Sequence, residues 1–149
     1  MTGITTFIFG LSAVAFNLLI AGIFIAQKKN ETRLVRTLGT ILIFLALPFG
    51  YVLVRYLTSG TNIWVRISLG VVLAYLLTEL LMDYILKVDF RSKWTTHVPY
   101  ILLEYAAFFG LIYTAFTISQ AWGWAVSVTF WIAMACLIYL YAGKKKKKS

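Results

Sequence analysis

The most constraining feature of this sequence is a series of five apolar stretches of about 20 residues each, joined by short polar segments. That length lets one α-helix cross a hydrocarbon core of about 30 Å. The chain is 61% hydrophobic and 13% charged, whereas soluble domains are about 45–50% apolar and about 25% charged. We therefore predict an all-α integral membrane protein, a five-transmembrane-helix bundle with helices over residues 4–26, 37–58, 63–86, 96–118 and 121–142.

These helices are expected to form a single transmembrane domain over residues 1–143, followed by a basic cytoplasmic tail over residues 144–149. The first stretch lacks the basic N-terminal region of a cleavable signal peptide, so we expect it to be retained as a helix. Pro48 predicts a kink in the second helix. Asn17 predicts a hydrogen bond between the first helix and a neighbouring helix.

Positive charge divides the connecting segments into two classes. Residues 27–36, 87–95 and 144–148 are basic, whereas residues 59–62 and 119–120 carry no charge. Basic segments stay on the cytoplasmic side of a membrane, so we predict that the N-terminus lies outside and the C-terminus lies in the cytoplasm. This alternation accounts for the net charge of +9 without nucleic-acid binding, and the basic segments are expected to attract anionic lipid. We expect a multi-pass protein of a prokaryotic cytoplasmic membrane.

Two acidic residues lie inside apolar stretches, Glu79 in the third and Glu104 in the fourth. At 100° per residue, the polar side chains of each of these helices fall within one narrow arc. The arcs contain Ser68, Tyr75, Glu79 and Asp83 in the third helix, and His97, Tyr100 and Glu104 in the fourth. The two helices are expected to be antiparallel neighbours, with both glutamates about 10–12 Å from the cytoplasmic end. We therefore predict an acidic cleft between them that opens towards the cytoplasm.

A carboxylate in this position needs a partner, because a charged side chain at the centre of a membrane helix costs about 2.5–3.5 kcal/mol. If the carboxyls of Glu79 and Glu104 meet, one of them is expected to keep its proton, since two like charges at close range are costly. Tyr75 and Tyr100 are expected to donate phenolic hydrogen bonds to them.

Three chemistries fit this set of residues. The first is a proton relay through Glu79 and Glu104, with Asp83 and His97 leading to the cytoplasm. The second is a divalent metal site built from Glu79, Asp83, His97 and Glu104, because carboxylates with one imidazole suit Mn²⁺, Fe²⁺ or Zn²⁺. The third is a pocket for a cationic or hydroxylated small molecule, with aromatic walls.

Each of these residues also has a purely structural interpretation. His97 is then a solvated side chain at the membrane interface, and Asp83 pairs with Lys87 one helical turn away. Glu79 and Glu104 would hydrogen-bond as neutral acids and specify helix packing. Arg55 and Arg66 flank the short outer loop, where they anchor the helices at the head groups or contact an anion or a partner.

Several chemistries are excluded by residue counts and motifs. Cys136 is the sole cysteine, which excludes an intramolecular disulfide. A single histidine excludes a bis-histidine haem, and the absence of lysine from the predicted helices excludes a retinal Schiff base. The sequence also lacks HExxH and GxSxG motifs. The cofactor is left open, with a divalent metal ion as the candidate.

Three classes of function remain. The first is a transporter or channel-like protein for a proton, a cation or a small polar solute. The second is an accessory or interaction subunit of a membrane complex. The third is a membrane-embedded enzyme that acts on a lipid or an isoprenoid. This third hypothesis includes both a metal-dependent and a metal-independent enzyme. Because five helices make a thin wall around a pathway, we expect a homo-oligomer or a membrane partner, with Ala106 and Gly110 as a small-residue contact face.

Overall fold

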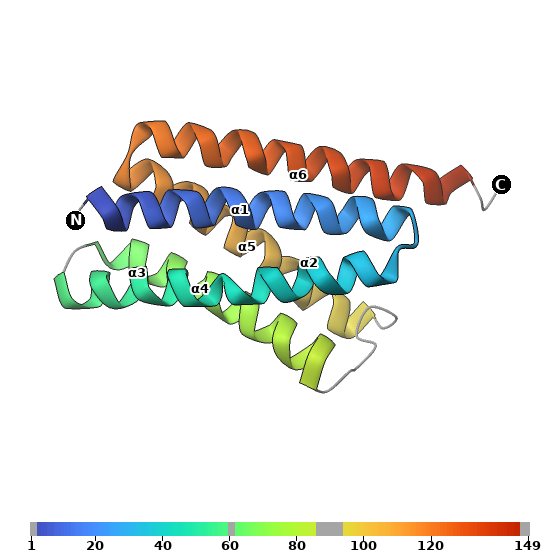
Figure 1. Cartoon of the computed structure of the whole chain (residues 1–149), viewed down its shortest axis with the longest axis horizontal. Helices are drawn as coiled ribbons and strands as arrows, with labels where there is room; N and C mark the ends of the chain where they lie inside the picture. The colour runs from blue at the N-terminus through green and yellow to red at the C-terminus, as the bar shows by residue number, and fades with distance from the viewer. Residues whose placement is uncertain (1–2, 60–61, 86–93, 147–149) are drawn as a thin grey trace.

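The structure is a computed structural model that describes residues 3–59, 62–85 and 94–146. These residues form six α-helices and one π-helical segment, with no strand among them. In chain order the elements are α1 (Gly3–Lys28), α2 (Thr32–Phe44), α3 (Ala46–Ser59), α4 (Ile63–Glu79), η1 (Leu80–Ile85), α5 (Trp94–Ile118) and α6 (Gln120–Lys146) (Figure 1).

The prediction of an all-α chain with five membrane-length helices is confirmed. Five helical segments are long and apolar enough to cross a membrane, namely Gly3–Lys28, Thr32–Thr58, Ile63–Met82, Val98–Ile118 and Gln120–Ala142. The second begins five residues before the predicted residue 37, because the basic segment after Glu31 is already helical. Helix α6 extends to Lys146, so the first three lysines expected in the tail belong to this helix.

The second membrane-length segment consists of α2 and α3, which follow one course in Figure 1 with a break at Leu45. Pro48 has no N–H to donate to the carbonyl of Phe44, four residues earlier. Helix α2 ends at Phe44, and the Leu45 N–H turns back to the Leu42 carbonyl at 3.1 Å. The helical pattern resumes with the Phe49 N–H on the Leu45 carbonyl at 3.2 Å. The kink predicted from Pro48 is therefore a helix break about one turn before it.

Helix α1 ends in a Schellman motif. The Glu31 N–H donates to the Ala26 carbonyl at 3.0 Å, and the Asn30 N–H donates to the Gln27 carbonyl at 3.2 Å. Asn30 has φ of 59°, the left-handed conformation that this motif requires and that asparagine tolerates. The chain reverses within a few residues, which makes α1 and α2 neighbours.

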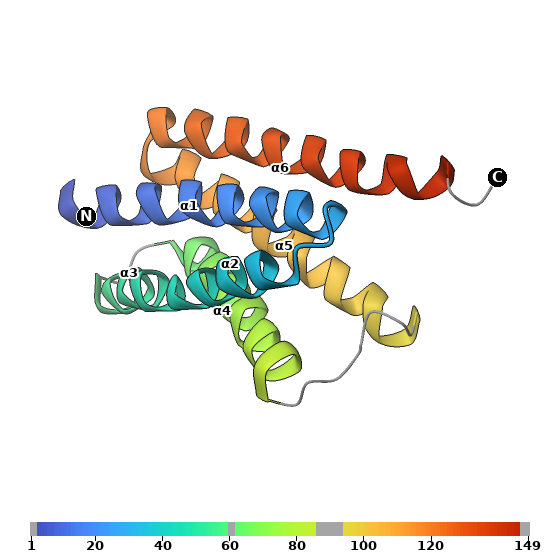
Figure 2. The same cartoon turned by 45° about the vertical axis from the view of Figure 1, so that its right-hand side comes forward.

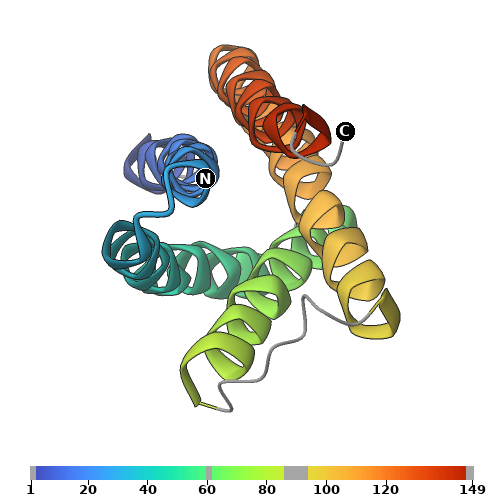
Figure 3. The ribbon, with the colours of Figure 1, turned by 90° about the vertical axis from the view of Figure 1, so that its right-hand side faces the viewer.

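Helix α1 is central to the packing. It contacts α6 on one side and α2 and α3 on the other. Figure 3 shows this arrangement in a view along the long axis of the bundle. Helices α4 and α5 pack against each other and are inclined to α1 and α6 (Figure 2). Asn17 of α1 donates from Nδ2 to the Val126 carbonyl at 3.0 Å and to the Thr129 hydroxyl at 2.9 Å, which confirms the predicted interhelical hydrogen bond.

Several basic residues lie at one end of the bundle, which we call the basic end. There α1 ends, α2 begins and α6 ends (Figure 1). Lys28 donates to the Tyr139 carbonyl and its ammonium lies 3.8 Å from the centre of the Tyr139 ring, which ties α1 to α6. The helical residues that make up the basic end are Lys28, Arg33, Arg36, Lys144, Lys145 and Lys146. Arg55 and Arg66 belong to the opposite end, close to where α3 ends and α4 begins.

Candidate functional site

Four ionisable side chains meet where α4 packs against α5. Tyr75 and Glu79 are four residues apart on α4, and Tyr100 and Glu104 are four residues apart on α5. Residues at this spacing lie one above the other on the same face of a helix. Because the two helices are packed against each other, each contributes one phenol and one carboxyl to the same place.

The hydroxyl of Tyr75 is the centre of this group. Its oxygen lies 3.1 Å from Oε1 of Glu79, 3.2 Å from the hydroxyl oxygen of Tyr100 and 3.4 Å from Oε1 of Glu104. We call these four residues the carboxyl–phenol cluster. The two helix arcs expected from the sequence thus meet through Tyr75, while the prediction that they bind a ligand or a proton stays a prediction.

The carboxyl–phenol cluster is largely shielded from solvent. The exposed fraction is 1% for Tyr75, 8% for Glu79 and 9% for Tyr100, and Glu104 is partly buried. The Tyr75 ring packs edge to face on Phe16 of α1, while its hydroxyl reaches the carboxyls. Tyrosine suits this position because its ring is apolar and its hydroxyl is a hydrogen-bonding group.

The helix changes its winding directly after Glu79. Residues Leu80–Ile85 form the π-helix η1, although the first apolar turns of α4 are regular α-helix. π-Helical segments are rare and are frequently found at functional sites. The residue types between 79 and 85 did not predict this change. Asp83 belongs to η1 and His97 to α5, but their side chains lie outside the described part of the structure, so their place in the cleft stays a prediction.

The metal site predicted from the sequence stays a prediction. Among the side chains that the structure describes, no group of three or more His, Cys, Asp or Glu residues is placed to hold a metal ion. The side chains of Asp83 and His97, half of the predicted ligand set, are not among those that the structure describes. Glu79 and Glu104 are the two predicted ligands that the structure does bring together, through the Tyr75 hydroxyl.

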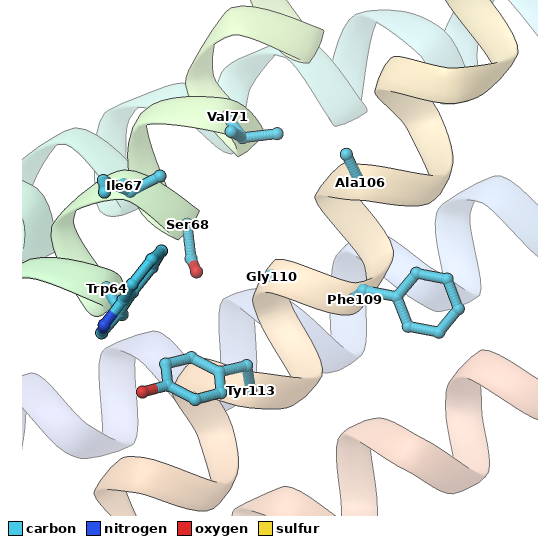
Figure 4. A pocket seen from close by; sticks show the side chains of 8 residues that line it. All are labelled: Trp64, Ile67, Ser68, Val71, Ala106, Phe109, Gly110 and Tyr113. Atoms are coloured by element: carbon cyan, nitrogen blue, oxygen red, sulfur yellow. The ribbon is translucent and has the colours of Figure 1, made fainter.

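A second concave feature lies further along the same helix pair, nearer to the start of α4. This α4–α5 groove has a volume of about 380 Å³ (Figure 4). It is lined by Trp64, Ile67, Ser68, Val71, Ala106, Phe109, Gly110 and Tyr113. Ser68, which the sequence placed in the arc of Glu79, therefore lines this groove and not the carboxyl–phenol cluster.

Close approach of the two helices forms the floor of the α4–α5 groove. A Cβ atom on Gly110 would lie 3.1 Å from Cβ of Ser68, so the missing side chain allows this contact. Gly110 was predicted to belong to a contact face between chains, and in the structure it packs against Ser68 of its own chain. Asn62 connects two residues that line the groove, because its side chain accepts from the Trp64 N–H at 3.0 Å and donates to the Tyr113 hydroxyl at 3.3 Å.

Comparison of the chain with models of protein families, with curated proteins and with solved structures yields no match.

Proposed function

We propose that this chain is a multi-pass integral membrane protein with its basic end in the cytoplasm. Five helices of sufficient length and apolarity support insertion. Large apolar side chains cover the outer surface, including Leu47, Trp131 and Ile138, which are 72%, 68% and 69% exposed. An outer surface with many exposed apolar side chains suits contact with lipid. The collection of Lys and Arg at one end supports the orientation, because such residues stay on the cytoplasmic side.

Within that membrane setting, we propose that the chain is a small transporter or channel-like protein for a proton, a cation or a small polar solute. The observation that carries this proposal is the buried Tyr75 hydroxyl between the carboxyls of Glu79 and Glu104. Glu104 lies ten residues into α5, about 15 Å from Trp94 along the helix axis. Ionisable residues at such depth are costly, and they mark ion and proton pathways in membrane proteins.

The chemistry of the carboxyl–phenol cluster fits this role. A carboxyl can hold or release a proton, and a carboxylate can bind a cation, while a phenol both donates and accepts hydrogen bonds. The cluster joins two neighbouring helices, so a change in its protonation alters a contact between α4 and α5. The π-helix η1 directly after Glu79 supports a functional role for this end of α4.

The proposal is tested with the full chain reconstituted into liposomes. A pH-sensitive dye inside the vesicles reports proton flux, and cation-sensitive dyes report flux of Na⁺ or K⁺. We expect a flux that Glu79→Gln and Glu104→Gln each abolish, with both variants still eluting as folded protein. Glu31→Gln is the matched control, because it removes an exposed carboxylate outside the carboxyl–phenol cluster. Wild-type vesicles that carry no flux above empty vesicles, together with recovery of a fixed membrane partner, would replace this proposal with that of an accessory subunit.

A further inference from the structure

The hydroxyl of Ser68 lies in the α4–α5 groove and differs from other hydroxyls on the membrane-length helices. Several hydroxyls donate to the carbonyl four residues earlier in their own helix, at 2.8–3.2 Å, namely those of Thr37, Thr40, Thr58, Thr78, Thr117, Ser127 and Thr129. Ser68 makes no hydrogen bond to any residue that the structure describes. Figure 4 shows its oxygen directed into the space between α4 and α5. The Ser68 hydroxyl is therefore a donor that is available to a ligand in the groove.

Two further hydrogen-bond donors line the same groove. The Tyr113 hydroxyl accepts from the Asn62 amide at 3.3 Å, which leaves its own proton to donate. The indole N–H of Trp64 is a donor only, and Trp64 is 62% exposed. None of the eight residues that line the groove carries a charge. An uncharged acceptor oxygen, such as that of a carbonyl group, is the complement of three donors in this setting.

The rest of the groove is apolar and lies on the outer surface of the bundle. Ile67 and Phe109 line it, and they are 48% and 60% exposed. When α4 and α5 cross a membrane, this surface faces the bilayer, so a ligand enters the groove from the lipid and not from water. Such a ligand has an apolar chain in addition to its acceptor oxygen.

The three donors lie at the depth at which a bilayer carries acceptor oxygens. Asn62 caps the start of α4, and Ser68 is six residues further, about 9 Å along the helix axis. Trp and Tyr side chains gather at this membrane–water interface. The ester groups of a phospholipid join its head group to its acyl chains, so their carbonyl oxygens lie at the same boundary. A phospholipid therefore brings its acceptors to Ser68 and its acyl chain towards Val71.

We propose that the α4–α5 groove binds a phospholipid of the outer leaflet. One acyl chain lies against Ile67, Val71 and Phe109, and the ester carbonyls accept hydrogen bonds from Ser68 and Tyr113. This inference rests on the proposed membrane insertion and orientation, and it is independent of transport. The alternative occupant is a helix of a second copy, whose backbone carbonyls already accept hydrogen bonds within that helix. A lipid ester has no such internal partner, so it complements the donors better.

Charge at this end of the bundle favours an anionic head group. Arg55 and Arg66 lie near the end of α3 and the start of α4, and residues 32–78 and 105–149 contain no Asp or Glu. The Nε atom of Arg66 is buried without a hydrogen-bond partner among the described residues. A lipid phosphate supplies negative charge at this end. A lipid with a net negative charge is therefore expected to bind more tightly than a zwitterionic one.

Binding of lipid to the purified full chain tests the proposal. Native mass spectrometry of the chain in detergent measures bound phosphatidylglycerol as the lipid is added. We expect Ser68→Ala and Tyr113→Phe each to weaken binding about two- to tenfold, since each removes one hydrogen bond. The controls are Ser127→Ala, whose hydroxyl is bonded within α6, and Tyr51→Phe, because Tyr51 is 43% exposed and Tyr113 is 44% exposed. Equal effects of the groove variants and their controls would overturn the proposal.

The chemistry of the lipid is varied in the same experiment. Phosphatidylglycerol with ether-linked chains keeps the head group and the chains but lacks the ester carbonyls, so it should bind at least about twofold more weakly. Phosphatidylcholine keeps the ester carbonyls and has no net charge, so its binding should be weaker but should still depend on Ser68. Equal binding of the ester and ether lipids would overturn the contact with the carbonyls and, with it, the proposal.

A variant that fills the groove separates a lipid from a second copy of the chain. Ala106 is exposed and lines the groove, so Ala106→Phe is expected to lower lipid binding more than Ser68→Ala does. Ala135→Phe is the control, because it adds the same side chain at an exposed position of α6. If Ala106→Phe instead turns a wild-type dimer into a monomer and leaves lipid binding unchanged, the groove is an interface between copies and the lipid proposal is overturned.

Flux in liposomes distinguishes this inference from the transport proposal. Selective lipid binding by a chain that carries no flux would support the lipid site and overturn transport alone. A chain that transports but binds the ester and ether lipids equally would overturn the lipid site alone.

Discussion

Phe16 and Tyr75 meet edge to face, with ring centroids 5.8 Å apart and ring planes at 69°. Phe16 also packs in this way on Phe49 and Phe108, at centroid distances of 6.2 and 5.8 Å. One ring on α1 thus contacts α3, α4 and α5 at once. Because the same contact fixes the Tyr75 ring, the aromatic core of the bundle determines where the Tyr75 hydroxyl lies.

Phe16→Ala is expected to lower the free energy of unfolding by about 3 kcal/mol, because it opens a cavity where four helices meet. The measurement is thermal or denaturant unfolding of the purified chain in detergent. Phe44→Ala is the control, since Phe44 is 64% exposed and should change stability far less. Equal effects of the two substitutions would contradict the central position of Phe16.

Asn17 and Thr129 are expected to be energetically coupled across α1 and α6. The Asn17 amide donates to the Thr129 hydroxyl at 2.9 Å within the buried part of the bundle. Asn17→Ala, Thr129→Val and the double variant form a cycle whose coupling free energy should be about 0.6–1.7 kcal/mol, as for other hydrogen bonds between membrane helices. If the changes in unfolding free energy of the two single variants add up to the change in the double variant, this hydrogen bond contributes nothing to stability.

Gly110→Val is expected to destabilise the chain by about 1–3 kcal/mol, since the added side chain forces α4 and α5 apart at Ser68. Gly70→Val is the matched control on α4, because a Cβ atom there meets nothing within 4 Å. Unfolding of both variants in detergent checks the difference. If Gly70→Val proves as destabilising as Gly110→Val, the cause is the backbone preference of glycine and not the close contact with Ser68.

The orientation of the chain is tested by labelling single cysteines in a Cys136→Ser background. In right-side-out vesicles, a membrane-impermeant maleimide should label Asn62→Cys at once. It should label Lys29→Cys only after the vesicles are permeabilised. The physical reason is that Lys29 belongs to the basic segment expected to stay in the cytoplasm, and both positions are exposed. The reverse pattern would require the opposite orientation of the whole bundle.

Much of the fold could be predicted from simple periodicities. The length of the apolar stretches was sufficient to identify five membrane-length helices. The 100° rotation per residue placed Tyr75 above Glu79 and Tyr100 above Glu104, and short connections made the two helices neighbours. These two facts predicted that the facing arcs of the two helices would meet, which the contacts of the Tyr75 hydroxyl bear out.

Other features depend on tertiary contacts that no single helix reveals. The role of Phe16 in holding Tyr75 requires the packing of α1 against α4 and α5, and nothing in its own stretch distinguishes it from Phe7 or Phe9. Ser68 shares an arc with Glu79 but lies about 16 Å away from it along the helix axis. Ser68 therefore lines the α4–α5 groove and does not reach the carboxyl–phenol cluster. The order of apolar residues did not predict the π-helix after Glu79, whereas Pro48 did predict an irregularity in the second helix, which the structure places at Leu45.

The contact between Lys28 and Tyr139 has a practical consequence. It shows that the last residue of α1, Lys28, and Tyr139 of α6 lie side by side at the same position along the bundle. Helix α6 continues for seven residues beyond Tyr139, a length of about 10 Å. The last turns of α6 therefore project past the end of α1. A carrier protein joined to them through a continuous helix would be held rigidly, with no change to the aromatic core, and would provide a marker for imaging this small chain.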